Sequence, residues 1–256
     1  MLNFRELSGR LNEFLRLSTY PVAVKLYERA EDLEKATVRR PEAKVAICQL
    51  FAQARYIGRV LGGTLSDVDI CVFGTTALGF TEYPDDVREG KRMLGIYHAT
   101  EEGGKKVFSE IPRFKLGTYS ALIAAPLHRT PVTPDVVLFY GNPAQILRLI
   151  HGYVWRTGER LTFSCSGEGT CADAVVTPMK TGKPSLAIPC NGIRILSIVQ
   201  DSELIMGVPT MLLDPILEGM DATHKGGIRY PPTFQMTYLT PQPPVSDVIG
   251  RAPKKS

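Results

Sequence analysis

Long apolar runs are missing from this chain. No stretch approaches the roughly 18 to 20 consecutive apolar residues that a membrane-spanning helix needs. Segment 1–17 carries charged residues between its leucines, so it lacks the uninterrupted apolar region of a secretory signal peptide. We therefore expect a cytoplasmic protein that has no membrane partner.

An excess of one charge sign is missing as well. The 30 lysines and arginines are nearly balanced by 26 acidic residues, which leaves a net charge of +4. The basic residues are spread along the chain and are not interleaved with aromatics, as they would be in a nucleic-acid-binding stripe. We therefore expect no nucleic-acid partner. The apolar fraction of 44% is typical of a globular protein with a sizeable core.

Closely spaced cysteine pairs are also absent. An odd number of cysteines without an export signal argues against a disulfide framework. The Cys-x-x-Cys spacing common in zinc and iron–sulfur sites does not occur. Because the chain has only four histidines, a metal site would depend on thiolates. The five cysteines are Cys48, Cys71, Cys165, Cys171 and Cys190.

The periodicity of apolar residues predicts both helices and strands. The expected helices are 1–17, 43–61 ending at Gly62-Gly63, 142–156 with Asn142 as N-cap, 171–180 interrupted by Pro178, and 209–220. The expected strands are 21–27, 68–73, 119–126, 136–140, 185–190, 194–199 and 203–208. A small-residue turn at 74–80 opens into a further helix, and the segment 96–109 around Glu102-Gly103-Gly104-Lys105 is expected to be a hairpin or surface loop.

This order of elements favours an α+β or mixed α/β fold over a doubly wound parallel sheet. We expect a single globular domain over residues 1–220, with two pseudo-repeated halves at about 1–118 and 119–220. Residues 221–256 are rich in proline, glycine and polar residues, which predicts an extended or disordered tail. The pattern fits a monomer or a homodimer.

A weak internal duplication links the two halves. Cys48 opens a helical stretch that is followed by glycine, a strand and Cys71, and Cys171 opens a similar stretch that leads to Cys190. The residue identity is slight, so coincidence is the alternative explanation. If the fold has a pseudo-two-fold axis, these four cysteines would converge on it.

The contexts of these cysteines differ in what they indicate. Cys171 follows a glycine-rich turn at an expected helix N-terminus, where the helix dipole favours a thiolate. Cys190 ends a strand, and Cys48 lies near a helix start. Cys71 alone, in the apolar stretch VDICVF, is typical of a core residue. The soft donor set favours a 4Fe-4S iron–sulfur cluster, and the alternatives are tetrahedral zinc or no metal.

Several stretches together resemble a known family. They are VAICQLFAQARYIGRVLGG…DICVFGTTALGF, APL…PDVVLFYGNPAQILRL, GTCAD and SLAIPCNGIR. They resemble the uncharacterised domain-of-unknown-function 169 family of archaea and mostly anaerobic bacteria, from about Phe14 to Met220. The resemblance implies a cysteine pattern at Cys48, Cys71, Cys171 and Cys190, with Cys165 outside it. It also implies an oxygen-poor cellular setting, and it supplies no activity.

Three further residues are candidates for catalysis. Arg194 would pair with a substrate carboxylate or offset cluster charge; a surface ion pair is the alternative. Asp173 is a candidate base or a first-turn helix acid. His151 is a candidate proton donor, although no Cys/His or Ser/His/Asp spacing supports a role for any histidine. The turn Ser164–Thr170 would cradle an anion or be a plain surface turn, and it lacks the ending of a P-loop.

The expected function is therefore that of an iron–sulfur cluster-binding protein with redox or lyase-type chemistry on a small organic molecule in an anaerobic setting. If it is an enzyme, it is an iron–sulfur oxidoreductase or lyase. Its partner is a small-molecule substrate or an electron-transfer partner. Two alternatives stay open: a metal-free small-molecule-binding or regulatory module, and an enzyme that uses Cys171 as its nucleophile.

Overall fold

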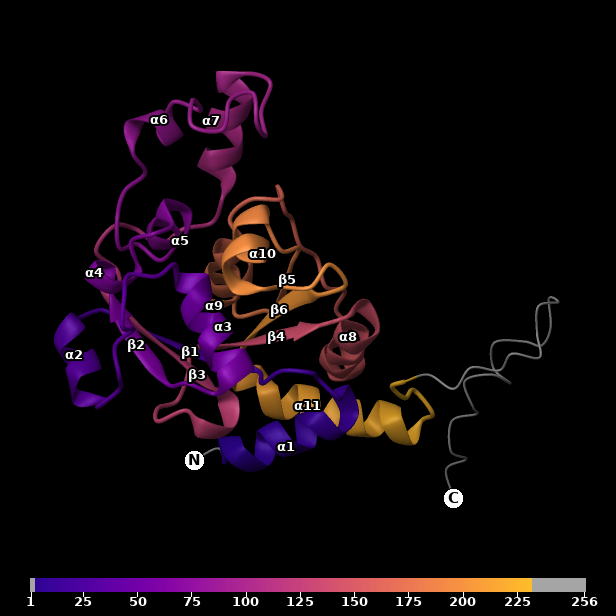
Figure 1. Ribbon diagram of the computed structural model, residues 1–256. Helices are drawn as coiled ribbons and strands as arrows, with labels where there is room; N and C mark the ends of the chain where they lie inside the picture. The colour runs from indigo at the N-terminus through magenta and orange to yellow at the C-terminus, as the bar shows by residue number, and fades with distance from the viewer. Residues whose placement is uncertain (1–2, 232–256) are drawn as a thin grey trace.

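The structure, a computed structural model, describes residues 3–231 (Figure 1). Its centre is a six-stranded sheet in the order β2-β3-β1-β4-β6-β5, and every pair of neighbouring strands is antiparallel. The expected mixed α/β fold is confirmed. The strands are β1 Val22–Tyr27, β2 Leu61–Thr64, β3 Ala121–Pro126, β4 Val136–Gly141, β5 Ser185–Ala187 and β6 Leu204–Pro209.

The sheet repeats one arrangement twice. In each half the first strand lies at the centre, the second at the edge, and the third is inserted between them. The halves meet where β1 pairs with β4, with Ala23 opposite Val137. Exchanging β1, β2 and β3 with β4, β5 and β6 reverses the strand order onto itself, as a two-fold axis between β1 and β4 would. Because β3 pairs with β1 and β2, the boundary falls in 127–135 rather than at residue 118.

The backbone after the third strand repeats as well. β3 ends at Pro126 with φ −58° and ψ 136°, and β6 ends at Pro209 with φ −54° and ψ 134°. A short 3₁₀ turn follows each proline, η1 Leu127–Arg129 and η3 Thr210–Leu212. The two turns share no residue identity, so this part of the duplication is visible only in the backbone.

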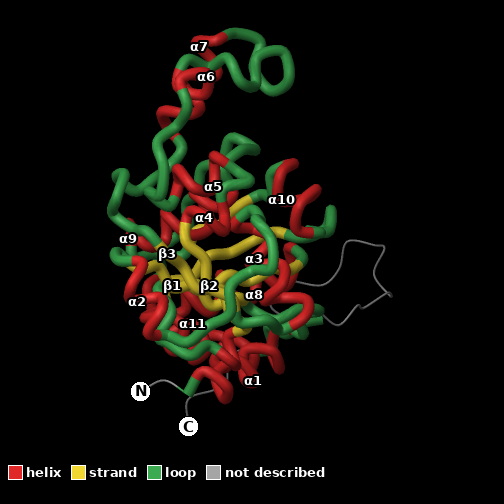
Figure 2. The backbone as a smooth tube through the Cα atoms, turned by 60° about the vertical axis from the view of Figure 1, so that its left-hand side comes forward, coloured by secondary structure: helices red, strands yellow, loops and turns green. Residues whose placement is uncertain are grey.

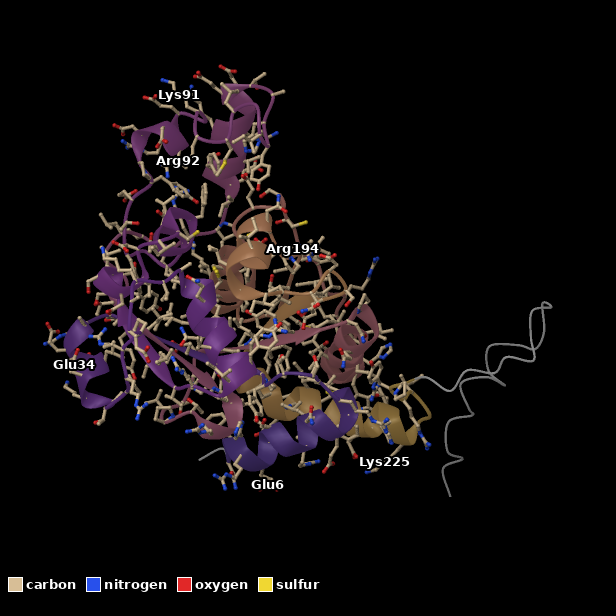
Figure 3. The ribbon with its side chains drawn as sticks, viewed as in Figure 1. Glu6, Glu34, Lys91, Arg92, Arg194 and Lys225 are labelled. Carbon is tan, nitrogen blue, oxygen red and sulfur yellow. The ribbon has the colours of Figure 1, made fainter. Side chains whose placement is uncertain are left out.

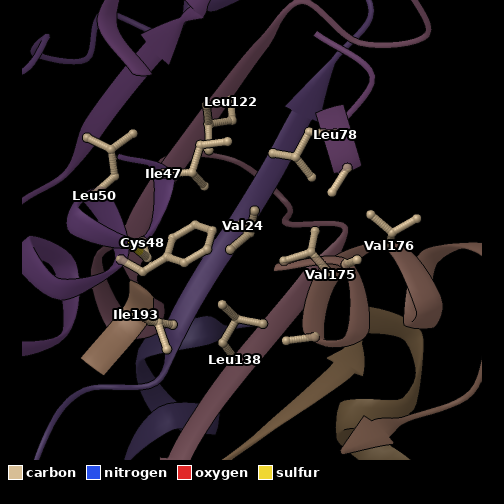
Figure 4. Packing of buried hydrophobic residues seen from close by; sticks show 14 of the residues in the cluster. Val24, Ile47, Cys48, Leu50, Leu78, Leu122, Leu138, Val175, Val176 and Ile193 are labelled. Atoms are coloured by element: carbon tan, nitrogen blue, oxygen red, sulfur yellow. The ribbon is translucent and has the colours of Figure 1, made fainter. Parts of the chain in front are cut away.

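Helices cover both faces of the sheet (Figures 1 and 2). On one face, which we call the α3 face, Val24 and Leu138 pack with Ile47 of α3 and Val175 of η2 (Figure 4). The elements there are α3 Ile47–Ile57, the π-helical η2 Ala172–Val176 and α9 Thr177–Thr181. The opposite face, the α8 face, is covered by α1 Phe4–Leu15, α2 Ala30–Lys35, α8 Pro143–Thr157 and α11 Leu213–Lys225.

A long connection between α5 and β3, residues 81–118, forms an arm that stands off the sheet (Figures 1 and 2). It carries α6 Asp85–Arg88 and α7 Glu101–Glu110. Phe73 of α5 stacks on Phe108 of α7 at 5.4 Å between ring centroids and lies 6.1 Å from the Tyr83 ring. These aromatic contacts attach the arm to the body. The remaining helices are α4 Leu65–Val68, α5 Val72–Ala77 and α10 Asn191–Ser197.

Several sequence predictions are confirmed. They include the helix starting at Asn142, whose side chain accepts the Gln145 N–H at 3.0 Å, in the capping-box geometry expected from the sequence. The N-terminal helix and the strands at 21–27, 119–126, 136–140 and 203–208 also form, as α1, β1, β3, β4 and β6. The turn expected at 74–80 is instead helical over most of its first half, where α5 runs to Ala77. The strand expected at 185–190 is shorter, because β5 ends at Ala187.

The prediction was wrong between residues 58 and 73. α3 ends at Gly58 in the left-handed region (φ 71°), not at Gly62-Gly63. Those two glycines lie in β2, where a Cβ on Gly62 would come within 2.6 Å of the Leu33 and Val38 side chains. The glycines are therefore needed for close packing at the sheet edge. The expected strand 68–73 is replaced by the end of α4 and the start of α5.

Two other segments predicted as loop or strand are helical. The expected hairpin at 96–109 contains α7, whose N-terminus is capped by the Thr100 hydroxyl. Its glycine pair permits close packing, since a Cβ on Gly104 would lie 2.7 Å from the Gly90 carbonyl oxygen. The expected strand 194–199 is largely α10, because a short apolar run does not distinguish a strand from a helix.

The chain end differs from the prediction at one place. α11 continues to Lys225, past Met220, where the tail was expected to begin. Residues 232–256 lie outside the described residues. No helix in residues 3–231 is both long enough and apolar enough to cross a membrane.

The contact between α8 and α11 gives a stability prediction. A Cβ on Gly152 would lie 2.5 Å from the Ile216 carbonyl oxygen, so Gly152→Ala should lower the free energy of unfolding by about 2 kcal/mol through overpacking. Gly9→Ala on α1 is the matched control, because nothing lies within 4 Å of that Cβ, and it should raise stability by about 1 kcal/mol. Urea unfolding measures both, and equal stability of the two variants would contradict the close helix contact.

Candidate functional site

The four cysteines of the duplicated pattern line a single pocket. Its volume is about 470 Å³, and we call it the cysteine pocket. Its walls come from both halves of the sheet and from the arm. Cys165 is exposed and does not line it. The lining residues used below are Cys48, Cys71, Cys171, Cys190, Ile70, Phe73, Gly74, Arg92, Met93, Tyr97, Glu168, Asn191, Ile195 and Leu196.

Each cysteine stands at the start of a helix. Cys48 is the second residue of α3, and Cys171 is the second residue of the helical stretch 170–181. Cys71 is the N-cap of α5, and Cys190 is the N-cap of α10. The two halves therefore place their cysteines at equivalent positions. Free N–H groups and the positive ends of four helix dipoles are directed toward the pocket.

In each half, the start of the helix that carries the first cysteine contacts the segment that carries the second. In the first half the backbone of Ala46, the N-cap of α3, bridges to Asp69. In the second half the Thr170 hydroxyl accepts the Cys190 N–H at 2.8 Å and donates to the Ile188 carbonyl at 3.3 Å. Asp69 and Ile188 each lie two residues before a cysteine. Each helix start is thus fixed against the segment that carries the second cysteine.

An element of the first half lies close to a cysteine of the second. A Cβ placed on Gly74 of α5 would lie 3.9 Å from Cys171 Sγ, which is an ordinary van der Waals distance. The start of α5 therefore lies beside Cys171 in the pocket that the four cysteines line.

Burial sets the protonation of the inner thiols. It raises the pKa of Cys48 to about 12, and the neighbouring Cys71 adds to the shift. Burial also raises the pKa of Cys171 well above its usual range, with further contributions from Cys48, Cys71 and Cys190. In the absence of a bound cation these thiols are protonated at neutral pH, whereas a metal ion deprotonates thiols that coordinate it. A nucleophilic Cys171 thiolate would require a lowered pKa, which is the opposite of the shift that burial causes.

An ion pair that the sequence did not reveal lies behind the cysteines. Arg55 of α3 is 1% exposed and pairs with Glu203 beside β6. Its guanidinium carbon lies 3.9 Å from the centroid of the Tyr140 ring. Burial raises the pKa of Tyr140, and the nearby Cys171 and Cys48 contribute to that rise. The pair joins the two halves, because Arg55 belongs to the first and Glu203 to the second.

The arm forms the outer wall of the pocket. The Tyr97 hydroxyl accepts a hydrogen bond from the Asn191 side chain at 3.0 Å. His98 Nε2 lies 3.1 Å from Glu168 Oε2. Arg92 makes a bidentate pair with Asp86 at 2.7 and 3.0 Å. Two polar contacts therefore hold the arm against the second half, and the arm's own arginine is paired.

Glu168 is a site residue that the sequence reasoning missed. It was hidden in the turn Ser164–Thr170, which was considered only as an anion cradle or a surface turn. The signal that pointed to it is an acidic residue between two glycines, three residues before Cys171. His98, its partner, was not singled out either, because nothing in the sequence connects residues 98 and 168.

The three predicted catalytic residues lie in different places. Asp173 is buried beside Cys171, and burial raises its pKa to about 7. Arg194 lies on α10 and donates to the Pro189 and Gln200 carbonyls and to Asp201 (Figure 3). His151 lies on α8, which packs on the face opposite α3. The structure thus brings Asp173 to the cysteines and does not bring His151 there.

Within residues 3–231, no group of three or more His, Cys, Asp or Glu side chains is arranged to hold a single metal ion. The four thiols of the cysteine pocket are the soft donors that line a common pocket, and Cys48, Cys71 and Cys190 are near enough to Cys171 to raise its pKa.

Alkylation tests the protonation of the thiols. In metal-free, reduced protein at neutral pH, iodoacetamide should modify the exposed Cys165 about 100-fold faster than Cys171 or Cys48, because burial shields these two thiols and raises their pKa values. Mass spectrometry of timed digests measures the rates. Preferential modification of Cys171 would instead support the nucleophile alternative.

Comparison with known proteins identifies the family. No solved structure matches the chain. An uncharacterized protein of Methanocaldococcus jannaschii is 30% identical over 220 residues, which cover 85% of this chain and 93% of that protein. Residues 10–219 match the sequence model of the domain-of-unknown-function 169 family, described as an uncharacterised ArCR. The match covers both halves of the sheet and all four pocket cysteines, and the chain belongs to this family.

Proposed function

We propose that Cys48, Cys71, Cys171 and Cys190 bind a 4Fe-4S cluster, and that the protein performs redox or lyase-type chemistry on a small organic molecule. The observation that carries the proposal is the convergence of four thiols from two equivalent halves on one pocket. Four thiolates match the usual ligand set of such a cluster.

The electrostatics of the pocket fit an anionic group. A cluster held by four thiolates is negatively charged, and burying such a charge requires compensating partners. The helix starts at Cys48, Cys71, Cys171 and Cys190 place positive dipole ends beside the pocket. Hydrogen bonds from such N–H groups to sulfur also tune a cluster's reduction potential.

The chemistry depends on how many of the four thiols bind. With all four as ligands the cluster would supply one-electron transfer, and with three it would supply Lewis acidity at the iron left without a protein ligand. The protein's own residues supply a largely apolar lining, to which Met93 of the arm and Ile195 and Leu196 of α10 contribute. A lining of low polarity strengthens polar interactions beside it.

The cellular setting belongs to the same proposal. We place the protein in the cytoplasm of an oxygen-poor cell, where an accessible cluster persists and the surrounding thiols stay reduced. Its partner is a small-molecule substrate or an electron-transfer protein. Pocket volumes of 300–1,000 Å³ are usual for small ligands, and the cysteine pocket, at about 470 Å³, lies within this range.

Anaerobic purification tests the proposal. Wild-type protein should be brown and contain about four iron and four sulfide per chain. Cys71→Ala combined with Cys190→Ala should lose most of this iron. Neither thiol makes a side-chain cap hydrogen bond, so the metal-free variant should unfold at nearly the same urea concentration as metal-free wild type.

Cys165→Ala is the matched control, because Cys165 is exposed and outside the pocket; it should retain the full iron and sulfide content. A colourless, iron-free wild-type protein after anaerobic reconstitution would sink the proposal. Full iron retention in the double variant would contradict the assignment of Cys71 and Cys190 as ligands.

A further inference from the structure

We propose that Glu168 binds the substrate of the cysteine pocket by accepting a hydrogen bond from a hydroxyl or amino head group on a small, mostly apolar molecule. The inference rests on the proposed function in placing that molecule beside the cluster. Arg194 suggested a substrate that carries a carboxylate. Glu168 indicates instead a substrate that donates a hydrogen bond.

Glu168 is held in the pocket wall by its backbone. It stands between Gly167 and Gly169, which have φ values of 78° and 72°, a region that favours glycine. A Cβ on Gly169 would come within 3.0 Å of the Ile111 side chain at the base of the arm. Glu168 itself is 8% exposed. The fold thus places an acidic side chain in a mostly apolar pocket, where it requires partners.

Only one of its two carboxylate oxygens has such a partner. Oε2 lies 3.1 Å from His98 Nε2, and the His98 ring packs edge-on against Phe108 at 5.5 Å between centroids. Oε1 is buried and has no hydrogen-bond partner within residues 3–231. Buried carboxylate oxygens are normally satisfied. Because Glu168 lines the pocket, a donor group of a bound molecule is the partner that Oε1 lacks.

The other charged groups near the pocket do not favour an anionic substrate. Arg92 is occupied by its bidentate pair with Asp86. Arg194 is bonded to Pro189, Gln200 and Asp201. Asp69 is paired with Lys44 at 2.7 Å. A substrate carboxylate would meet Glu168 and the thiolates, and like charges in a pocket of low dielectric repel strongly.

The apolar part of the lining defines the rest of the molecule. Ile70, Phe73, Met93, Ile195 and Leu196 form much of the wall. Ile70 is 53% exposed and Ile195 is 80% exposed, so apolar surface is available to a ligand at the mouth. A short branched hydrocarbon body with one donor head group fits this lining.

Three probes with the same branched four-carbon skeleton separate the head groups: isobutanol, isobutylamine and isobutyrate. Saturation-transfer NMR measures their binding to the anaerobically reconstituted protein and to Glu168→Gln. In wild type, the alcohol or the amine should bind at least about tenfold more tightly than the acid, as expected for a hydrogen bond to a charged acceptor. In Glu168→Gln the preference of the tighter-binding donor probe, alcohol or amine, over the acid should fall by about tenfold or more.

Glu110→Gln is the matched control, because Glu110 is exposed at the end of α7; it should keep the wild-type preference. Comparing isobutanol with isobutylamine decides which head group binds. Binding of the acid in wild type as tight as that of both the alcohol and the amine, binding of none of the three probes, or an unchanged preference in Glu168→Gln would each overturn the inference.

Iron and sulfide are assayed on the same samples. If the cluster is present and Glu168→Gln keeps the wild-type probe preference, the inference about Glu168 is wrong and the cluster proposal stands. Iron-free protein in which that preference falls defeats the cluster proposal and leaves Glu168 as the binding residue.

Discussion

The antiparallel pairing of β1 with β4 is the constraint on which the rest of the structure depends. It joins two halves of the same topology, with Val22 opposite Leu138 at one end of the paired segment. Because each half carries two cysteines at helix starts, the pairing brings four helix starts to one pocket. The buried Arg55–Glu203 pair also joins the two halves. Removing one partner of such a buried pair costs about 3–5 kcal/mol, so the site and the centre of the fold depend on each other.

The cysteine pocket concentrates groups that are unfavourable on their own. Cys48 and Cys171 are held where their thiolates are disfavoured, and Glu168 is buried with one oxygen unbonded. Stable proteins keep such features chiefly where function requires them. A cluster would convert the thiols into ligands, and a bound donor would satisfy Glu168. The arm closes the pocket through the contact between Tyr97 and Asn191 and the contact between His98 and Glu168.

Much of this was readable from the sequence, and the failures have physical causes. The Asn142 cap and the cysteine duplication depend on local signals, and the structure has both. Gly62 and Gly63 were misassigned as a helix end, because close packing at a sheet edge leaves the same glycine signature as a helix stop. Glu168 was missed because its role arises from contact with His98, far away in the chain. The local sequence pattern indicated two related halves. The outer wall of the pocket depends on contacts made by the arm, which no local pattern reveals.

The central claim is that four cysteines from two halves hold one cluster. The most direct measurement is the anomalous scattering of iron in a crystal grown and cooled without oxygen. The account predicts one compact iron peak bounded by the sulfurs of Cys48, Cys71, Cys171 and Cys190, each within about 2.3 Å of an iron. Iron bound elsewhere in the chain, or four cysteine sulfurs too far apart to share one cluster, would contradict it.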